Sequence, residues 1–248
     1  MGPLTSTARD LSPCSGASGA RKIGAVPSPA LLRRFAAIGD VHAEDARLAH
    51  VLTWLSGQDV EAVLSVGDIV DGAGDHDRCC ALLRAHAAIV VRGNHERAML
   101  ANPFACQPRF IADDSLAFLA ALPVTRRMPT LGGEMMLCHG VGDNDHVRLH
   151  PQHHETSQAA IHALHPLLAD AALRLVVAGH THRRMVRSFP RPVGPPLIFV
   201  NPGTLHRGYP ASVAIVDLGR GQVEFHEVLA EPGSPIVVQP AEVVPLRA

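Results

Sequence analysis

The chain has 248 residues, a net charge of −1 and 18% charged residues. This length can bury the core of one α/β domain, and the balanced charge gives no general attraction to nucleic acid or to an anionic membrane. No apolar run approaches the ~18–20 residues of a membrane-spanning helix, and five cysteines without a C-x-x-C pair are typical of a reducing compartment. The composition therefore predicts a soluble, cytoplasmic protein without a membrane partner.

The two ends of the chain differ in composition from the region between them. Residues 1–30 are rich in Pro, Ser, Gly and Ala and contain no apolar segment of the secretory kind. We expect them to form a disordered tail, because such a composition buries too little apolar surface to fold. Residues 231–248 are rich in Pro and Val, and we expect a loose C-terminal tail there. The folded domain is therefore predicted to cover residues 31–230.

The first part of this domain alternates between strand and helix patterns. The segments concerned are strands at 34–38, 62–66 and 88–91 and helices at 44–55 and 78–86. Helices between successive strands imply right-handed crossovers and a largely parallel sheet. Loops that carry function are then expected at the carboxyl edge of that sheet.

In the second part of the domain, helices and strands no longer alternate regularly. Helices are expected at 96–101, 113–121 and 156–168, and strands at 128–131, 134–138, 173–178, 185–189, 197–200, 212–217 and 222–228. Gly132 and Gly133 separate two apolar runs and indicate a hairpin. The polar, His-rich segment 143–155 is too irregular for a regular element. The last strands have no helices between them, which favours antiparallel pairing.

Short segments that supply Asp, Asn or His follow several of these predicted strands. Asp40 and His42 stand two residues apart, so that both side chains can face one pocket. His180 and His182 repeat this spacing after a later strand. The other donors, each closing a different strand, are Asp68, Asn94 and His139. Carboxylate and imidazole ligands suit a first-row divalent metal, and seven donors suit two ions that share a carboxylate.

In chain order these segments read D-x-H, G-D, G-N-H-E, H and G-H-x-H, at 40–42, 67–68, 93–96, 139 and 179–182. The series resembles the motifs of the calcineurin-like metallophosphoesterase superfamily and covers the region from about residue 34 to residue 228. The resemblance implies an α/β fold, a four-layer α-β-β-α sandwich of two mixed sheets flanked by helices. It is closer to the compact bacterial and archaeal phosphodiesterases, with some features of the phosphatase branch.

The resemblance also implies a role for each motif residue. Two divalent metal ions would share Asp68 as a bridge. The other ligands would be Asp40, His42 and His182 for the first ion and Asn94, His139 and His180 for the second. A hydroxide between the ions would attack phosphorus, and His95 would be the general acid for the leaving oxygen. Mn²⁺ is the first choice of metal, and Fe, Zn, Ni and Co are the alternatives.

Other residues near these motifs leave alternatives open. Arg92 stands where the phosphatase branch has an arginine that contacts phosphate, but it could equally form a surface ion pair. Glu96 is expected to be a favourable first-turn carboxylate of a helix and not a catalytic group. Residues 143–146 form either a solvated loop or part of the substrate entrance. Residues 201–203 predict a turn with only an indirect role at the site.

The predicted function is the hydrolysis of phosphodiester or phosphomonoester bonds in a small phosphorylated substrate such as a nucleotide. Within the same class, the alternatives are a Ser/Thr-phosphatase-like enzyme and a dinucleoside polyphosphate hydrolase. In another class, the chain would be a non-catalytic scaffold for protein assembly on the same fold. A scaffold needs neither the acid nor the whole ligand set, whereas this chain has His95 and all seven donors, which favours the enzyme.

Overall fold

The computed structural model describes residues 2, 31–102, 111–231 and 233–246. The predicted tail at 1–30 lies outside this range except for Gly2, and so do Cys14 and Cys106. Within the described ranges, none of the helices has both the length and the apolar character needed to span a bilayer. Every segment on which the predicted site depends lies among the described residues.

The first half of the domain alternates strand and helix, as predicted. Its elements are β1 (Arg34–Ile38), α1 (Asp45–Leu55), β2 (Val63–Ser65), α2 (His76–Ala85) and β3 (Ile89–Val90). β1 pairs with β2 and β2 pairs with β3, both in parallel. α1 buries Leu48, Val51, Leu52 and Leu55, the apolar stripe that a helix of this period presents to a sheet.

The second half contributes the remaining helices and most of the strands. Its elements are α3 (Asn94–Ala101), α4 (Asp113–Ala120), β4 (Arg126–Thr130), β5 (Gly133–Leu137), a 3-10 turn (His153–Glu155), α5 (Gln158–Ala169), β6 (Leu173–Val177), β7 (Arg184–Phe189), β8 (Leu197–Pro202), β9 (Ser212–Asp217), β10 (Gln222–Leu229) and β11 (Val237–Pro245). β4 and β5 form the predicted hairpin. The expected antiparallel pairs are β7 with β8 and β9 with β10, whereas β6 and β8 are parallel.

The strands form two mixed sheets. The six-stranded sheet has the order β11-β10-β9-β1-β2-β3, and the five-stranded sheet has the order β4-β5-β6-β8-β7. β9 belongs to the second half of the chain but pairs antiparallel with β1, so the six-stranded sheet contains strands from both halves. This crossing places the loop between β8 and β9 beside the loop that follows β1.

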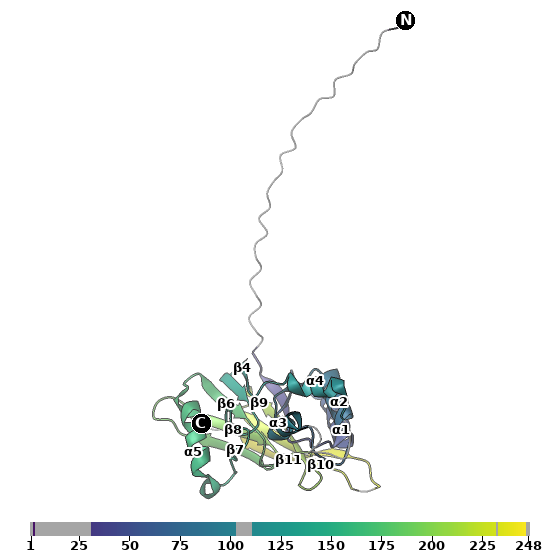
Figure 1. Ribbon diagram of the computed structural model, residues 1–248. Helices are drawn as coiled ribbons and strands as arrows, with labels where there is room; N and C mark the ends of the chain where they lie inside the picture. Colours follow the sequence, from purple (N-terminus) through teal and green to yellow (C-terminus); the bar gives the residue numbers. More distant parts are fainter. Residues whose placement is uncertain (1, 3–30, 103–110, 232, 247–248) are drawn as a thin grey trace.

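Three hydrophobic clusters separate the layers. One lies between the six-stranded sheet and α1 and α2, a second lies between the two sheets, and a third joins the five-stranded sheet to α5. Successive residues of β1 alternate between faces: Phe35 and Ala37 belong to the second cluster, while Ala36 and Ile38 belong to the first. Figure 1 shows α1, α2 and α4 on one side, α5 on the other, and the strands between them. The predicted four-layer sandwich is therefore confirmed.

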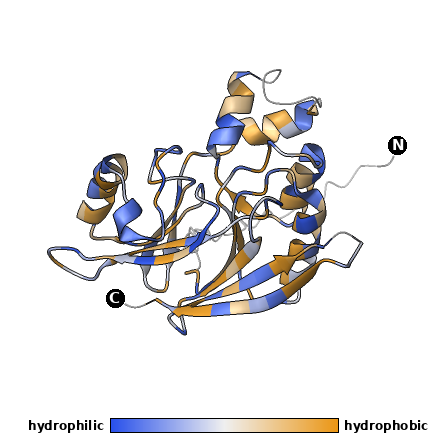
Figure 2. Ribbon diagram, turned by 90° about the horizontal axis from the view of Figure 1, so that it is seen from below, coloured by the Kyte–Doolittle hydropathy of each residue, from blue (hydrophilic) through white to orange (hydrophobic). Residues whose placement is uncertain are grey.

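The prediction of a loose C-terminal tail at 231–248 is wrong for its central part. β11 pairs with β10 along nearly its whole length, and the domain therefore extends beyond residue 230. The β-branched valines favour a strand, and the hairpin runs along the lower edge of Figure 2 with hydrophobic and hydrophilic residues alternating. Pro240 is tolerated because it lies on an edge strand, next to the unpaired Ala241, where the register of β11 shifts opposite Phe225 and His226.

Candidate metal centre

The predicted ligands lie in loops at the carboxyl ends of strands. Asp40 follows β1, Asp68 follows β2, His139 follows β5 and His180 follows β6, while Asn94 begins α3 shortly after β3. These strand ends belong to different sheets, and side chains from both sheets meet between them. The structure therefore brings all seven predicted ligands together, at the sheet edge where the strand pattern predicted them.

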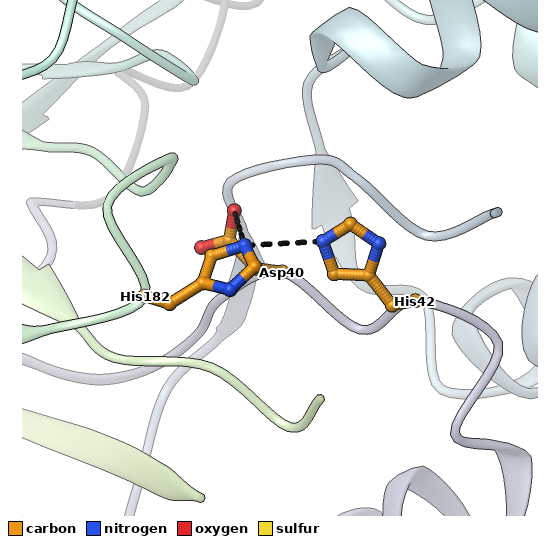
Figure 3. A group of neighbouring side chains, drawn as sticks. All are labelled: Asp40, His42 and His182. Carbon is orange, nitrogen blue, oxygen red and sulfur yellow. Dashed lines mark hydrogen bonds and ion pairs between the residues drawn. The ribbon is translucent and has the colours of Figure 1, made fainter. Parts of the chain in front are cut away.

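Asp40, His42 and His182 form one cluster, called here the Asp40 group (Figure 3). The Nε2 atoms of His42 and His182 are 3.1 Å apart, and Nε2 of His182 lies 3.5 Å from Oδ1 of Asp40. Figure 3 shows both imidazoles and the carboxylate turned toward one another. Asp40 and His42 are 0% and 4% exposed, so the cluster is largely shielded from water.

Asp68, His139 and His180 form a second cluster, called here the Asp68 group. Nε2 of His139 lies 3.1 Å from Oδ2 of Asp68, 3.2 Å from Nδ1 of His180 and 2.9 Å from Oδ1 of Asn94. Oδ2 of Asp68 also lies 3.9 Å from Nε2 of His42 in the other group. Asp68 therefore occupies the position that a carboxylate shared by both groups needs.

Hydrogen bonds on the far side of the imidazoles determine which ring nitrogen donates. Nδ1 of His139 lies 2.8 Å from the carbonyl oxygen of Val66, and Nε2 of His180 lies 3.2 Å from that of His146. A carbonyl oxygen only accepts, so these nitrogens carry the proton. When the rings are neutral, their other nitrogens present lone pairs to the centre of the Asp68 group.

His42 follows the same pattern, because its Nδ1 donates to the carbonyl oxygen of Asp71 over 3.0 Å. Its Nε2 lone pair then faces Nε2 of His182. Lone pairs and carboxylate oxygens that converge in a buried site repel one another unless a positive charge lies among them. Histidines that bind metals are usually backed by such acceptors, and mixed imidazole and carboxylate donors suit first-row divalent metals. The residues present therefore fit metal ions.

Within each group, one side chain has a raised pKa and at least one imidazole has a lowered pKa. Burial raises the pKa of Asp40 to about 8 and lowers the pKa of His180 to about 4 and of His182 to about 3. Burial also acts to lower the pKa of His139, but the adjacent Asp68 carboxylate outweighs burial and raises it to about 9. Without metal, His139 is therefore protonated on both ring nitrogens at neutral pH. A bound cation would take the place of the proton on Nε2.

Five of the seven predicted ligands have a left-handed backbone. Their φ angles are 41° for Asp40, 47° for His42, 51° for Asp68, 69° for His180 and 59° for His182. Residues other than glycine rarely adopt this conformation, which costs on the order of 1–3 kcal/mol each and persists where the surrounding structure enforces it. Such a concentration of strain is typical of functional sites and is independent of the motif argument.

Two motif glycines leave space for the carboxylates. A Cβ atom at Gly93 would lie 2.1 Å from Oδ1 of Asp68, and one at Gly179 would lie 2.7 Å from Oδ2 of Asp40. Both distances are well below van der Waals contact. The glycines of the G-N-H-E and G-H-x-H segments are therefore required by the position of the ligand carboxylates, which explains why they accompany the ligands in sequence.

Glu96 fixes the loop that carries Asp68. Its side chain is fully buried and accepts hydrogen bonds of 2.7–3.1 Å from the backbone amides of Gly93, Asp68, Ile69 and Val70. Its predicted place in the first turn of a helix is correct, since it is the third residue of α3 and its carboxylate accepts from the amide of the N-cap residue Gly93. The spacing from Gly93 predicts only that local bond, and the bonds to the distant loop required the structure.

His95 lies between the two groups. Its Nδ1 is 2.5 Å from Oδ2 of Asp71, its Nε2 is 3.7 Å from Oδ2 of Asp68, and its ring centroid is 4.8 Å from that of His42. Its side chain is 32% exposed, so it can reach a bound substrate. Sequence reasoning missed the part played by Asp71, for which the signal is its place three residues after Asp68 in the G-D-I-V-D segment.

Two of the open alternatives concern groups near the Asp68 group. Arg92 is half-buried, and its side chain forms no ion pair with the described part of the chain, so the surface ion pair lacks support. The loop at 143–146 belongs to the rim of the site, because the carbonyl of His146 accepts from His180 and Asp145 pairs with Arg97 over 2.7 Å. This loop is therefore more than a solvated connection.

The segment 201–203, for which the sequence predicts a turn, differs in the structure: Asn201 and Pro202 end β8 and pair with β7, and only Gly203 lies beyond the strand. The segment supports the site from behind. Nδ2 of the buried Asn201 donates to the carbonyl of Gly179 over 2.8 Å, and Oγ1 of Thr204 donates to the carbonyl of Asp40 over 2.7 Å. The end of β8 and the residues after it thus join the loops that carry ligands from the two sheets. The role of this segment is indirect, as expected.

Two rim residues were not singled out by sequence reasoning. The ring of His206 lies 5.1 Å from that of His42, and the ring of Tyr209 lies 4.6 Å from that of His182, measured between centroids. Both belong to the loop between β8 and β9. No local motif marks them, since their position depends on the crossing from the second sheet to the first.

Residues 33–184 match the family model described as calcineurin-like phosphoesterase. Among solved structures, a metallophosphoesterase from Sphaerobacter thermophilus is similar, with 26% identity, a TM-score of 0.58 and coverage of 81% of this chain and 89% of that chain. The hypothetical protein PH1004 from Pyrococcus horikoshii OT3 shares 16% identity with a TM-score of 0.62, covering 80% of this chain and 89% of its own.

Vps29 complexed with Zn²⁺ from Entamoeba histolytica shares 19% identity with a TM-score of 0.50, covering 86% of this chain and 99% of its own. PH1004 and Vps29 are similar in fold alone. None of the curated proteins matches the chain in sequence. The matched segment makes up more than half of the chain and contains all seven predicted ligands. The chain belongs to the calcineurin-like phosphoesterase family.

Proposed function

We propose that this protein is a phosphoester hydrolase that uses two divalent metal ions. The observation that carries the proposal is the convergence of the Asp40 and Asp68 groups, whose lone pairs point inward while three imidazoles donate outward to carbonyl oxygens. Such a donor set has little use in a merely structural cluster, because without a metal ion its mutual repulsion is relieved only by added protons, such as those on His139 and Asp40. Family membership and the strained backbone of the same residues support this proposal.

The proposed ligand sets follow from the contacts. The first ion would be held by Asp40, His42, Asp68 and His182, and the second by Asp68, Asn94, His139 and His180. When bound, the ions would supply Lewis acidity toward the phosphoryl oxygens and toward the attacking water. We propose Mn²⁺ as the first metal to test, since the mixed donors also suit Fe, Zn, Ni and Co.

His95 is the proposed general acid. Asp71 holds its Nδ1, so Nε2 is the ring nitrogen that faces the space between the groups. A proton at Nε2 can pass to the leaving oxygen of a phosphoester placed there. Asp71 is then a positioning residue, because its contact with Nδ1 fixes the orientation of the His95 ring.

Arg92 is the proposed phosphate contact. It lies two residues before Asn94, and its guanidinium has no carboxylate partner among the described residues. A half-buried guanidinium without a partner is suited to a bidentate bond with a phosphoryl group. The proposed substrate is a small phosphorylated molecule such as a nucleotide.

The experiment is an assay of Mn²⁺-loaded protein on p-nitrophenyl phosphate, bis-p-nitrophenyl phosphate and a panel of nucleotides, dinucleoside polyphosphates and phosphopeptides. We expect hydrolysis that EDTA abolishes and Mn²⁺ restores. The preferred substrate separates diesterase, monoesterase, dinucleoside polyphosphate hydrolase and protein phosphatase. If protein that has bound two ions hydrolyses none of these substrates, the result would contradict the proposal and support a non-catalytic scaffold.

A further inference from the structure

One part of the site has no role in the proposed ligand sets. The loop between β8 and β9 carries His206 and Tyr209 along the rim of the Asp40 group. Tyr209 is the only tyrosine of the chain, and its ring meets that of His182 edge to face at 4.6 Å. His206 lies 5.1 Å from His42 and 5.7 Å from Tyr209, between centroids. The two rings thus extend the imidazoles of the Asp40 group toward solvent.

The loop is held in place by bonds on both sides of His206. Oγ1 of Thr204 donates to the carbonyl of Asp40, and the amide of Tyr209 donates to the carbonyl of His206 over 3.2 Å. Between them, Arg207 donates through its backbone amide and its guanidinium to the buried carboxylate of Glu44. The position of the rings is therefore set by the fold, which distinguishes them from aromatic residues on a free surface loop.

The exposure of Tyr209 indicates what this rim can bind. If the ring only shielded His182 from water, it would be largely buried, but 47% of the residue is exposed. The opposite rim, beside the Asp68 group, is charged and already ion-paired through Arg97 and Asp145. That rim also carries the exposed imidazole of His146, whose ring centroid lies 6.3 Å from that of His180. Among these rim residues, Tyr209 therefore offers the largest aromatic ring to an apolar planar group on a bound phosphoester.

We propose that Tyr209, with His206 beside it, forms a subsite that stacks on the nucleobase of a nucleoside phosphate. This inference rests on the proposed function, because the metal ions would hold the phosphoryl group next to the subsite. Stacking on an aromatic ring tolerates every base, so the subsite selects nucleotides over sugar phosphates without reading the base. A second consequence is that the ring and not the hydroxyl of Tyr209 carries the interaction.

The test compares the binding of AMP and ribose 5-phosphate, which differ by the base. Affinities are measured by isothermal titration calorimetry on Mn²⁺-loaded protein with His95→Ala, so that turnover does not consume the ligand. We expect AMP to bind about 10-fold more tightly than ribose 5-phosphate, the range of one base stacked on one ring. Tyr209→Ala should remove this preference, and Tyr209→Phe, the matched control, should keep it.

Equal affinity for the two ligands, a preference that survives Tyr209→Ala, or no binding of either ligand would overturn the inference. These outcomes are separate from the proposed function. A protein that shows the Tyr209-dependent preference but hydrolyses no phosphoester refutes the catalytic proposal alone. A protein that hydrolyses phosphoesters but binds both ligands equally refutes the base subsite alone.

Discussion

The Asp40 group and the Asp68 group contain the same kinds of ligand atom, yet the protein supports them differently. In the Asp68 group both imidazoles donate their outward N–H to a carbonyl oxygen. In the Asp40 group only His42 does so, whereas Nδ1 of His182 is buried and has no hydrogen-bond partner among the described residues. One group is therefore fixed by its surroundings on every ring, and the other is fixed on one ring only.

Because of this difference, we expect the two proposed ion positions to be unequal. A hydrogen-bonded acceptor behind a histidine fixes the ring and increases its basicity, and loss of such a partner typically costs about 10- to 100-fold in metal affinity. We therefore expect the Asp68 group to bind its ion more tightly and the Asp40 group to release its ion first. The looser position is also the one beside the proposed base subsite.

The largest expected effect comes from removing the carboxylate that both groups share. Asp68→Ala should abolish binding of both ions and lower kcat/KM by more than about 1,000-fold, since both the Lewis acidity and the charge compensation would be lost. Metal content after gel filtration measures the loss of the ions, a kinetic assay measures kcat/KM, and a circular dichroism spectrum checks that the variant is folded. Asp59→Ala, at an exposed aspartate, is the control. If the Asp68 variant kept both ions, the shared position would be wrong.

His95→Ala should separate chemistry from metal binding. Loss of a general acid typically lowers turnover by about 10²- to 10⁴-fold. Both groups should keep their ions, because His95 is not among the proposed ligands. Turnover and metal content are measured on the same sample, and Asp71→Asn should give a smaller loss of turnover because the ring of His95 remains. Normal turnover in the His95 variant would remove its assigned role.

The comparison between the groups is tested by paired variants. His182→Ala should abolish the weaker phase of a Mn²⁺ titration and leave the tighter phase intact, whereas His139→Ala should weaken the tighter phase and leave the weaker phase intact. Calorimetric titration resolves the phases, and His162→Ala, at an exposed histidine of α5, is the control. Equal effects on both phases would show that the difference in support has no consequence for affinity.

A smaller effect concerns pH. The pKa of His139 is raised to about 9 by Asp68 against the effect of burial, and burial raises the pKa of Asp40 to about 8. Below these values each group holds a proton that the ion must displace, so Mn²⁺ affinity should increase from pH 6 to pH 8. The limit is about 10-fold per pH unit for each displaced proton. Titrations in buffers of different ionisation enthalpy count the protons released. An affinity independent of pH would contradict these protonation states.

The sequence was sufficient for those parts of the site that follow strand ends. Asp40, Asp68, His139 and His180 come directly after apolar runs, and parallel strands bring their carboxyl ends to one edge. The layers could be predicted because the family resemblance supplied them. The predicted limits of helices and strands were close to the observed limits, because the periodicity of apolar residues identifies the buried faces of these elements.

The parts that sequence reasoning missed depend on contacts between distant segments. Asp71 meets His95 only after the loop beyond β2 takes up its left-handed turn, and Tyr209 reaches His182 only because β9 crosses to the first sheet. β11 was missed because its prolines predict a loop, although an edge strand with a bulge accommodates them. Local patterns carry no information on such partners.

The most direct measurement is anomalous X-ray diffraction from crystals soaked in Mn²⁺ at increasing concentration. We expect two peaks, one on each side of the Asp68 carboxylate. The peak at the Asp68 group should fill at the lower concentration, and the peak beside His42 and His182 should follow. A single peak, or two peaks that do not share Asp68, would contradict the proposed metal centre.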